Sequence, residues 1–179
     1  MNRNRHLLLA VSRRYQLVTF VETGTDAGHT VEAVRHHFSK VYSIESKPEN
    51  FRAVQARFSG VENVKLFEGF SSLVLPCVLQ GHGISRALFW LDAHAYDQNG
   101  GYATPEGDQV PGELRAIAAY APESLVIVDD VEVGAHGFTV NSCYPFTVPD
   151  GWHFRHFHRW AFLHRGGYIL PDNLSELEG

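Results

Sequence analysis

The sequence predicts a doubly wound α/β fold with a mostly parallel seven-stranded sheet and an antiparallel strand pair near the C-terminus. Short apolar runs rich in β-branched residues alternate with segments whose apolar residues recur at helical spacing. That alternation is typical of parallel strands joined by crossover helices. The chain has 179 residues, of which 44% are hydrophobic and 20% charged, and this balance predicts one globular domain over residues 1–179.

The first part of the chain predicts helix and strand in turn. The apolar run at the start is too short to span a bilayer, and no small-residue cleavage site follows it, so a short helix is expected. Residues 17–24 form an apolar run that ends in glycine and predict the first strand. Residues 30–39 have helical spacing, and residues 40–46 predict the second strand. Pro48 suits the first turn of the next helix.

The later elements follow the same alternation. The nearly continuous apolar run at residues 86–94 predicts a central strand, because both faces of such a strand are buried. The aromatic tail predicts two last strands, at residues 152–160 and 167–171, antiparallel to each other. The remaining predicted elements are strands at residues 63–69 and 124–130 and helices at residues 71–80 and 112–120.

Composition and charge limit the classes of partner that we expect for this chain. The formal net charge of −5 argues against a duplex nucleic acid, which favours a basic face, and no segment predicts a membrane span. Cys77 and Cys143 form no disulfide framework, so a reduced, cytoplasmic setting is expected. The aromatic tail is a candidate dimer edge. Two long connections, residues 95–110 and 131–151, follow strand ends and are expected to be functional, the first as a lid.

The first strand–helix connection, VETGTDAGHT, predicts a nucleoside site. Gly24 allows a tight turn and Gly28 a close approach, and Glu45 ends the second strand about 20 residues later, where an acid can bind ribose hydroxyls. The pattern G-x-G-x-x-G is absent, and acids at Glu22 and Asp26 disfavour a pyrophosphate. They suit a cationic ligand such as the sulfonium of S-adenosylmethionine. The alternatives are that Gly24 only closes a turn and Glu45 is a solvated strand end.

These residues also resemble a known family. The runs F-V-E-T-G-T-x-x-G-x-T, V-Y-S-I-E, W-L-D-A-H, G-G-x-x-T-P-E-G-D-Q-V-P-G-E-L and V-I-V-D-D, within residues 19–131, resemble the class I S-adenosylmethionine-dependent methyltransferases, near the macrocin-type sugar O-methyltransferases. The resemblance implies a Rossmann-like fold, with Glu22, Gly24 and Thr25 lining the methionine part, Glu45 holding the ribose, and Gly69 and Ser71 near the adenine. The candidate cofactor-binding residues are Glu22, Thr23, Gly24, Thr25, Gly28, Glu45, Gly69, Ser71 and Asp92.

Three aspartates end neighbouring strands of the predicted sheet. Asp92 follows the fourth strand, and Asp129 and Asp130 end the fifth, so their carboxylates are expected to converge. Mg²⁺ prefers such oxygen ligands and would relieve their repulsion, and the resemblance to metal-dependent O-methyltransferases implies the same set. The alternative is that Asp92 caps a turn and one later aspartate points to solvent. His94 is a candidate general base beside Asp92; an ordinary packed histidine or a further metal ligand is the alternative.

The sequence thus favours an S-adenosylmethionine-dependent methyltransferase, with O-methylation of a small hydroxylated acceptor such as a sugar or diol and with a divalent metal as a candidate aid. Two alternatives remain open. A metal-dependent hydrolase would use the aspartates but would leave the ETGT loop and Glu45 without a role. A non-catalytic S-adenosylmethionine-binding protein would keep the nucleoside site without turnover.

Overall fold

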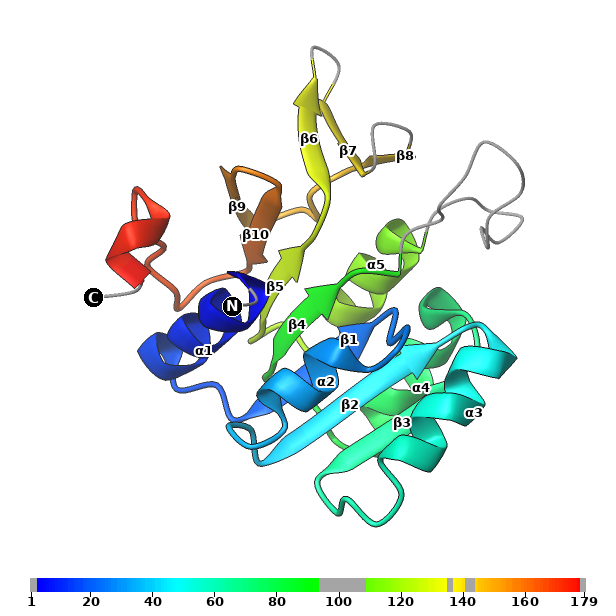
Figure 1. The fold of residues 1–179 in the computed structure, drawn as a ribbon. Coiled ribbons are helices and arrows are strands. Elements are labelled where there is room, and N and C mark those ends of the chain that lie inside the picture. Colours follow the sequence, from blue (N-terminus) through cyan, green and yellow to red (C-terminus); the bar gives the residue numbers. More distant parts are fainter. Residues whose placement is uncertain (1–2, 94–108, 135–136, 141–143, 178–179) are drawn as a thin grey trace.

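The centre of the molecule is a seven-stranded sheet with the order β3-β2-β1-β4-β5-β10-β9 (Figure 1). The structure is a computed structural model that describes residues 3–93, 109–134, 137–140 and 144–177. β1 to β5 run parallel, and β10 pairs antiparallel with both β5 and β9. The strands are β1 (Thr19–Thr23), β2 (Lys40–Glu45), β3 (Val64–Glu68), β4 (Leu88–Leu91), β5 (Leu125–Val128), β9 (His153–Phe157) and β10 (Trp160–His164).

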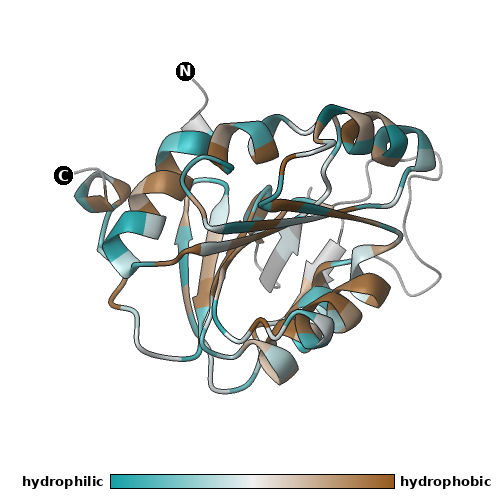
Figure 2. Ribbon diagram, turned by 90° about the horizontal axis from the view of Figure 1, so that it is seen from below, coloured by the Kyte–Doolittle hydropathy of each residue, from teal (hydrophilic) through white to brown (hydrophobic). Residues whose placement is uncertain are grey.

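Helices cover both faces of this sheet, as Figure 2 shows from below. Successive strand residues point to opposite faces, so Phe20 of β1 packs in the layer of α1–α3 and Val21 in the layer of α4 and α5. No helix in the described ranges is long and apolar enough to cross a bilayer. The helices are α1 (Arg3–Tyr15), α2 (His29–Val34), α3 (Pro48–Arg57), α4 (Ser71–Gly81) and α5 (Val110–Tyr120), with a 3-10 turn η1 (Leu174–Leu177).

The predicted doubly wound, mostly parallel sheet with its antiparallel C-terminal pair is confirmed, but the pair was placed wrongly in the sequence. The two strands are β9 and β10, joined by a turn in which His158 has φ +56°. The prediction treated residues 152–160 as one strand, because aromatic and polar residues keep alternating as the chain enters that turn. Residues 167–171 form no strand; they begin at Gly167, with φ +78°.

Residues 131–151 also differ from expectation, since they hold regular structure. β6 (Val131–Gly134), β7 (Gly137–Val140) and β8 (Tyr144–Phe146) form a separate antiparallel sheet. It extends beyond the carboxyl end of β5, at the same edge of the main sheet as the carboxyl ends of β1 and β4 (Figure 1). This edge is where open α/β sheets place their ligands.

Candidate functional site

Gly24 sets the turn after β1 directly against the end of β4. Its φ is +81°, and its N–H donates to the carbonyl of Ile44 at 2.9 Å. A Cβ at this position would lie 2.4 Å from the carbonyl oxygen of Asp92, so the two loops touch only because residue 24 is glycine. The turn after β1 is therefore held to β2 on one side and to β4 on the other.

Glu45, at the end of β2, turns its carboxylate back toward the loop after β1. One oxygen accepts the N–H of Asp26 at 2.7 Å and the other accepts the N–H of Lys47 at 2.8 Å. The residue is buried, which excludes the alternative of a solvated strand end. Each carboxylate oxygen can accept more than one hydrogen bond, so Glu45 keeps capacity for a ligand hydroxyl.

Glu22 lies under this loop in a chain of buried hydrogen bonds. The Ser43 hydroxyl donates to Glu22 Oε2 at 2.6 Å and lies 2.6 Å from the Thr25 hydroxyl. The pKa of Glu22 is raised to about 8, chiefly by burial and in smaller part by the charges of Asp92 and Glu45, while the hydrogen bond from Ser43 opposes the shift. Three carboxyl groups from the ends of β1, β2 and β4 thus influence one another. Ser43 was missed in the sequence, although a lone serine inside an apolar strand was a usable signal.

The raised pKa of Glu22 predicts a dependence of stability on pH. In the folded chain this group binds its proton up to about pH 8, whereas its ordinary value is 4.5, so the folded state binds more protons in that window. Stability should fall as pH rises through the window, by at most about 1.4 kcal/mol per pH unit, and level off above it. Glu22→Gln should lose this fall in urea unfolding at about pH 5, 6.5 and 8.

The matched control for that experiment is Glu32→Gln on α2. Glu32 is a partly exposed acid whose pKa is lowered, chiefly by a hydrogen bond from Arg35. This control should retain the wild-type fall in stability between about pH 5 and 8. Parallel pH curves for wild type and Glu22→Gln would contradict the protonated state inferred for Glu22.

The other predicted cofactor residues line the same edge in different ways. Gly28 has φ +74°, and a Cβ there would lie 2.7 Å from the Phe58 ring; Gly69 has φ +133° and its N–H donates to the Glu45 carbonyl at 2.8 Å. Thr23 is fully buried, and its hydroxyl has no hydrogen-bond partner within the described segments. Ser71 donates its hydroxyl proton to Glu113 at the start of α5.

An arginine contacts the two acids that follow β5, whereas the expected approach of Asp92 to them stays a prediction. Arg159, in the turn between β9 and β10, donates from Nε to Asp129 Oδ1 at 2.8 Å and pairs through Nη2 with Asp130 Oδ1. Burial lowers the pKa of Arg159. The negative charges of Asp129, Asp130 and Asp92 outweigh this effect, so the pKa is raised overall. Arg159 was not predicted as a site residue, because nothing in its local sequence links it to aspartates about 30 positions earlier.

The predicted metal set finds no support in this arrangement. The part of the chain that the structure describes contains no cluster of three or more His, Cys, Asp or Glu side chains set to hold a metal ion. Asp129 Oδ1 and Asp130 Oδ1 are both paired with the guanidinium of Arg159. His94, the candidate base, and nearly all of the predicted lid at residues 95–110 lie outside the described residues.

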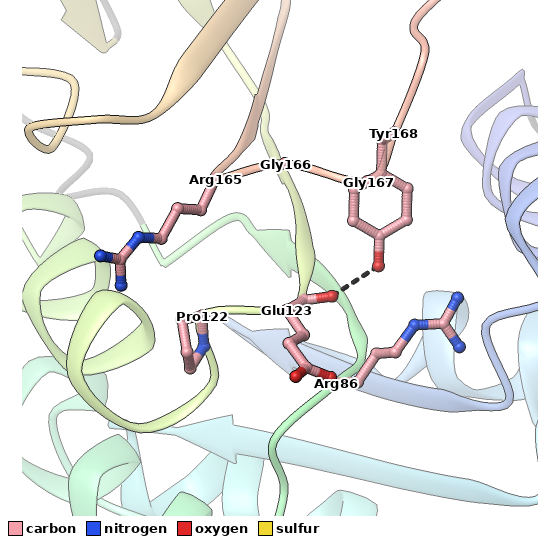
Figure 3. A pocket seen from close by; sticks show the side chains of 7 residues that line it. All are labelled: Arg86, Pro122, Glu123, Arg165, Gly166, Gly167 and Tyr168. Carbon is pink, nitrogen blue, oxygen red and sulfur yellow. Dashed lines mark hydrogen bonds between the residues drawn. The ribbon is translucent and has the colours of Figure 1, made fainter.

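A separate hollow of about 480 Å³ lies at the opposite edge of the sheet (Figure 3). Arg86 and Glu123 precede β4 and β5, and the Tyr168 hydroxyl donates to the Glu123 carbonyl at 2.6 Å. The hollow is lined by Arg86, Pro122, Glu123, Arg165, Gly166, Gly167 and Tyr168. None of the predicted site residues lines it, so it is distinct from the edge that holds Gly24 and Glu45.

No protein-family model matches the chain, and no curated protein matches it in sequence. Solved structures match in fold. The O-methyltransferase TomG from Streptomyces achromogenes, involved in tomaymycin synthesis and solved with SAM, has a TM-score of 0.55 at 18% identity over 73% of this chain and 56% of that one. An O-methyltransferase from Bacillus cereus, in complex with SAH, has a TM-score of 0.54 at 14% identity over 73% and 57%.

A third structure matches over more of its length. The Escherichia coli protein yhhF, which carries a provisional methyltransferase assignment, has a TM-score of 0.58 at 11% identity over 93% of this chain and 88% of that one. The present chain spans little more than half of the two O-methyltransferases. At these identities the likeness is one of fold: the chain has the Rossmann-like fold of the class I methyltransferases.

Proposed function

We propose that the chain binds S-adenosylmethionine and transfers its methyl group to an oxygen of a small hydroxylated molecule. The observation that carries the proposal is the acidic edge formed by Glu22, Glu45 and Asp92 around the Gly24 turn. Carboxylates attract a sulfonium and an ammonium group, and S-adenosylmethionine carries both. Glu45 in addition offers acceptor oxygens at the place where doubly wound folds bind ribose hydroxyls.

The residues present fit this ligand. Gly24 lets the loop after β1 pack directly against the backbone that follows β4, because any side chain at this position would collide with the Asp92 carbonyl. The backbone N–H groups of Asp26 and Lys47 fix the Glu45 carboxylate before a ligand arrives, so little ordering is needed on binding. Glu22 stays protonated below about pH 8 in the free chain, and a cationic ligand nearby would favour its ionised form.

The chemistry asks little of the protein beyond positioning. When bound, S-adenosylmethionine supplies an electrophilic methyl group and leaves as the neutral thioether S-adenosylhomocysteine. The acceptor oxygen forms the new bond to the methyl carbon and loses its proton to a base. We assign the base role to His94 and the placement of the acceptor to Asp92, with most of the acceleration coming from alignment and exclusion of water. A sugar or diol, as for macrocin-type enzymes, is the acceptor class we propose to test first.

Calorimetric titration with S-adenosylmethionine and S-adenosylhomocysteine tests the proposal. We expect both to bind, and we expect transfer of a radiolabelled methyl group to at least one member of a panel of sugars, diols and phenols. Binding without transfer to any acceptor would favour the non-catalytic alternative. Absence of binding would overturn the proposal. The hydrolase alternative would then remain, although the described residues offer no metal cluster for it.

A further inference from the structure

Arg159 is fixed by both its side chain and its backbone at the carboxyl end of β5. Its Nε donates to Asp129 at 2.8 Å, its Nη2 pairs with Asp130, and its carbonyl accepts the N–H of Val131 at 2.8 Å. The turn between β9 and β10 is thereby joined to the point where β5 ends. A guanidinium held to two successive carboxylates in this way has a defined position rather than a free surface conformation.

The two aspartates need a cation at this point. Asp129 is 1% exposed, and its Oδ1 also accepts the N–H of Asp130 at 2.9 Å. Asp130 has φ +53°, a left-handed conformation that turns the chain sharply and keeps its carboxylate near that of Asp129. Adjacent carboxylates of which one is buried repel each other unless a positive charge lies between them. Arg159 supplies that charge from a part of the chain distant in sequence.

A divalent metal would compete with Arg159 for the same oxygens. Mg²⁺ binds carboxylate oxygens at about 2.0–2.1 Å in near-ideal octahedral geometry. Asp129 Oδ1 already accepts two N–H donors, and Asp130 Oδ1 is in contact with the guanidinium. A metal bound to those atoms would lie beside a like charge in a partly buried site, which is unfavourable.

We infer that Arg159 is the built-in cation of this edge, occupying the Asp129–Asp130 pair in place of a divalent metal. Arg159 is then a positioning residue that acts through these two aspartates, and methyl transfer at this site needs no added metal. The inference rests on the proposed function for its meaning in catalysis. Its test measures metal binding, so it can fail or succeed independently of S-adenosylmethionine binding.

The test is a titration of the full chain with Mn²⁺, followed by the paramagnetic signal of the free ion. The wild type should show no specific Mn²⁺ binding. Arg159→Met, which keeps the length of the side chain and removes its charge, should gain specific Mn²⁺ binding, at least about tenfold tighter than any nonspecific binding by the wild type. Adding Asp129→Asn to that variant should abolish the gain, and thermal unfolding of Arg159→Met should shift upward only when Mn²⁺ is present.

Arg155→Met is the matched control, because Arg155 lies in the same hairpin and pairs only with the exposed Asp172 among the described residues. It should gain no Mn²⁺ binding. A folded Arg159→Met that binds no Mn²⁺ would overturn the inference. So would Mn²⁺ binding to the wild type that Asp129→Asn removes, and this second arm decides the question even if Arg159→Met does not fold.

Discussion

Gly24→Ala should abolish detectable binding of S-adenosylmethionine and lower the free energy of unfolding by more than about 2 kcal/mol. The added Cβ would lie 2.4 Å from the Asp92 carbonyl oxygen, and the left-handed φ of +81° is itself strained for alanine. The contact is with backbone, so it cannot be relieved by a rotamer change. The loops after β1 and β4 must separate, and the acidic edge around them must open. Calorimetry and urea unfolding measure the two effects.

Gly60→Ala is the control for backbone strain alone. Gly60 has a similar φ of +78°, but no atom lies within 4 Å of a Cβ built there. It should cost only about 1 kcal/mol of stability and leave cofactor affinity unchanged. Equal losses of affinity in the two variants would contradict the role assigned to the contact between Gly24 and Asp92.

Glu45→Gln should weaken S-adenosylmethionine binding by about 10- to 150-fold, the range expected when hydrogen bonds to a charged acceptor are lost. The amide has one acceptor oxygen, whereas the carboxylate serves the N–H groups of both Asp26 and Lys47. One of those donors would face an NH₂ group, so the loop would also lose an anchor. The measurement is calorimetric affinity for S-adenosylmethionine and S-adenosylhomocysteine, which share the ribose and should weaken together.

Glu68→Gln is the matched control for that variant. Glu68 pairs in register with Glu45 on the neighbouring strand β3, but its side chain is exposed. It should keep wild-type affinity. Undiminished binding by Glu45→Gln would mean that the ribose lies elsewhere, and the proposed function would lose its principal contact.

The sequence was sufficient for the parallel core because each of those strands is an apolar run bounded by turn residues. Leu88–Leu91 and Leu125–Val128 are fully buried, as continuous apolar runs predict for central strands. The C-terminal strand pair was misplaced because the alternation of aromatic and polar residues continues into the turn at His158. A histidine gives no sequence signal for the left-handed backbone that it has there. The small sheet of β6–β8 was missed because its short strands contain glycine, proline and polar residues and so form no continuous apolar run.

The candidate site was predictable where the signal is local. The spacing of Gly24 and Glu45 around one strand–helix unit was enough to place both at the same edge. The partners of the aspartates were not predictable, because Arg159 reaches Asp129 through the pairing of β10 with β5. Ser43 was overlooked since its hydroxyl matters only through its position between Glu22 and Thr25.

A crystal structure of the chain with S-adenosylhomocysteine tests the central claim most directly. The account predicts the nucleoside over the turn at Gly24, with its ribose hydroxyls within hydrogen-bond distance of the Glu45 carboxylate. A ligand bound instead in the hollow beside Tyr168, or ribose hydroxyls away from Glu45, would contradict it.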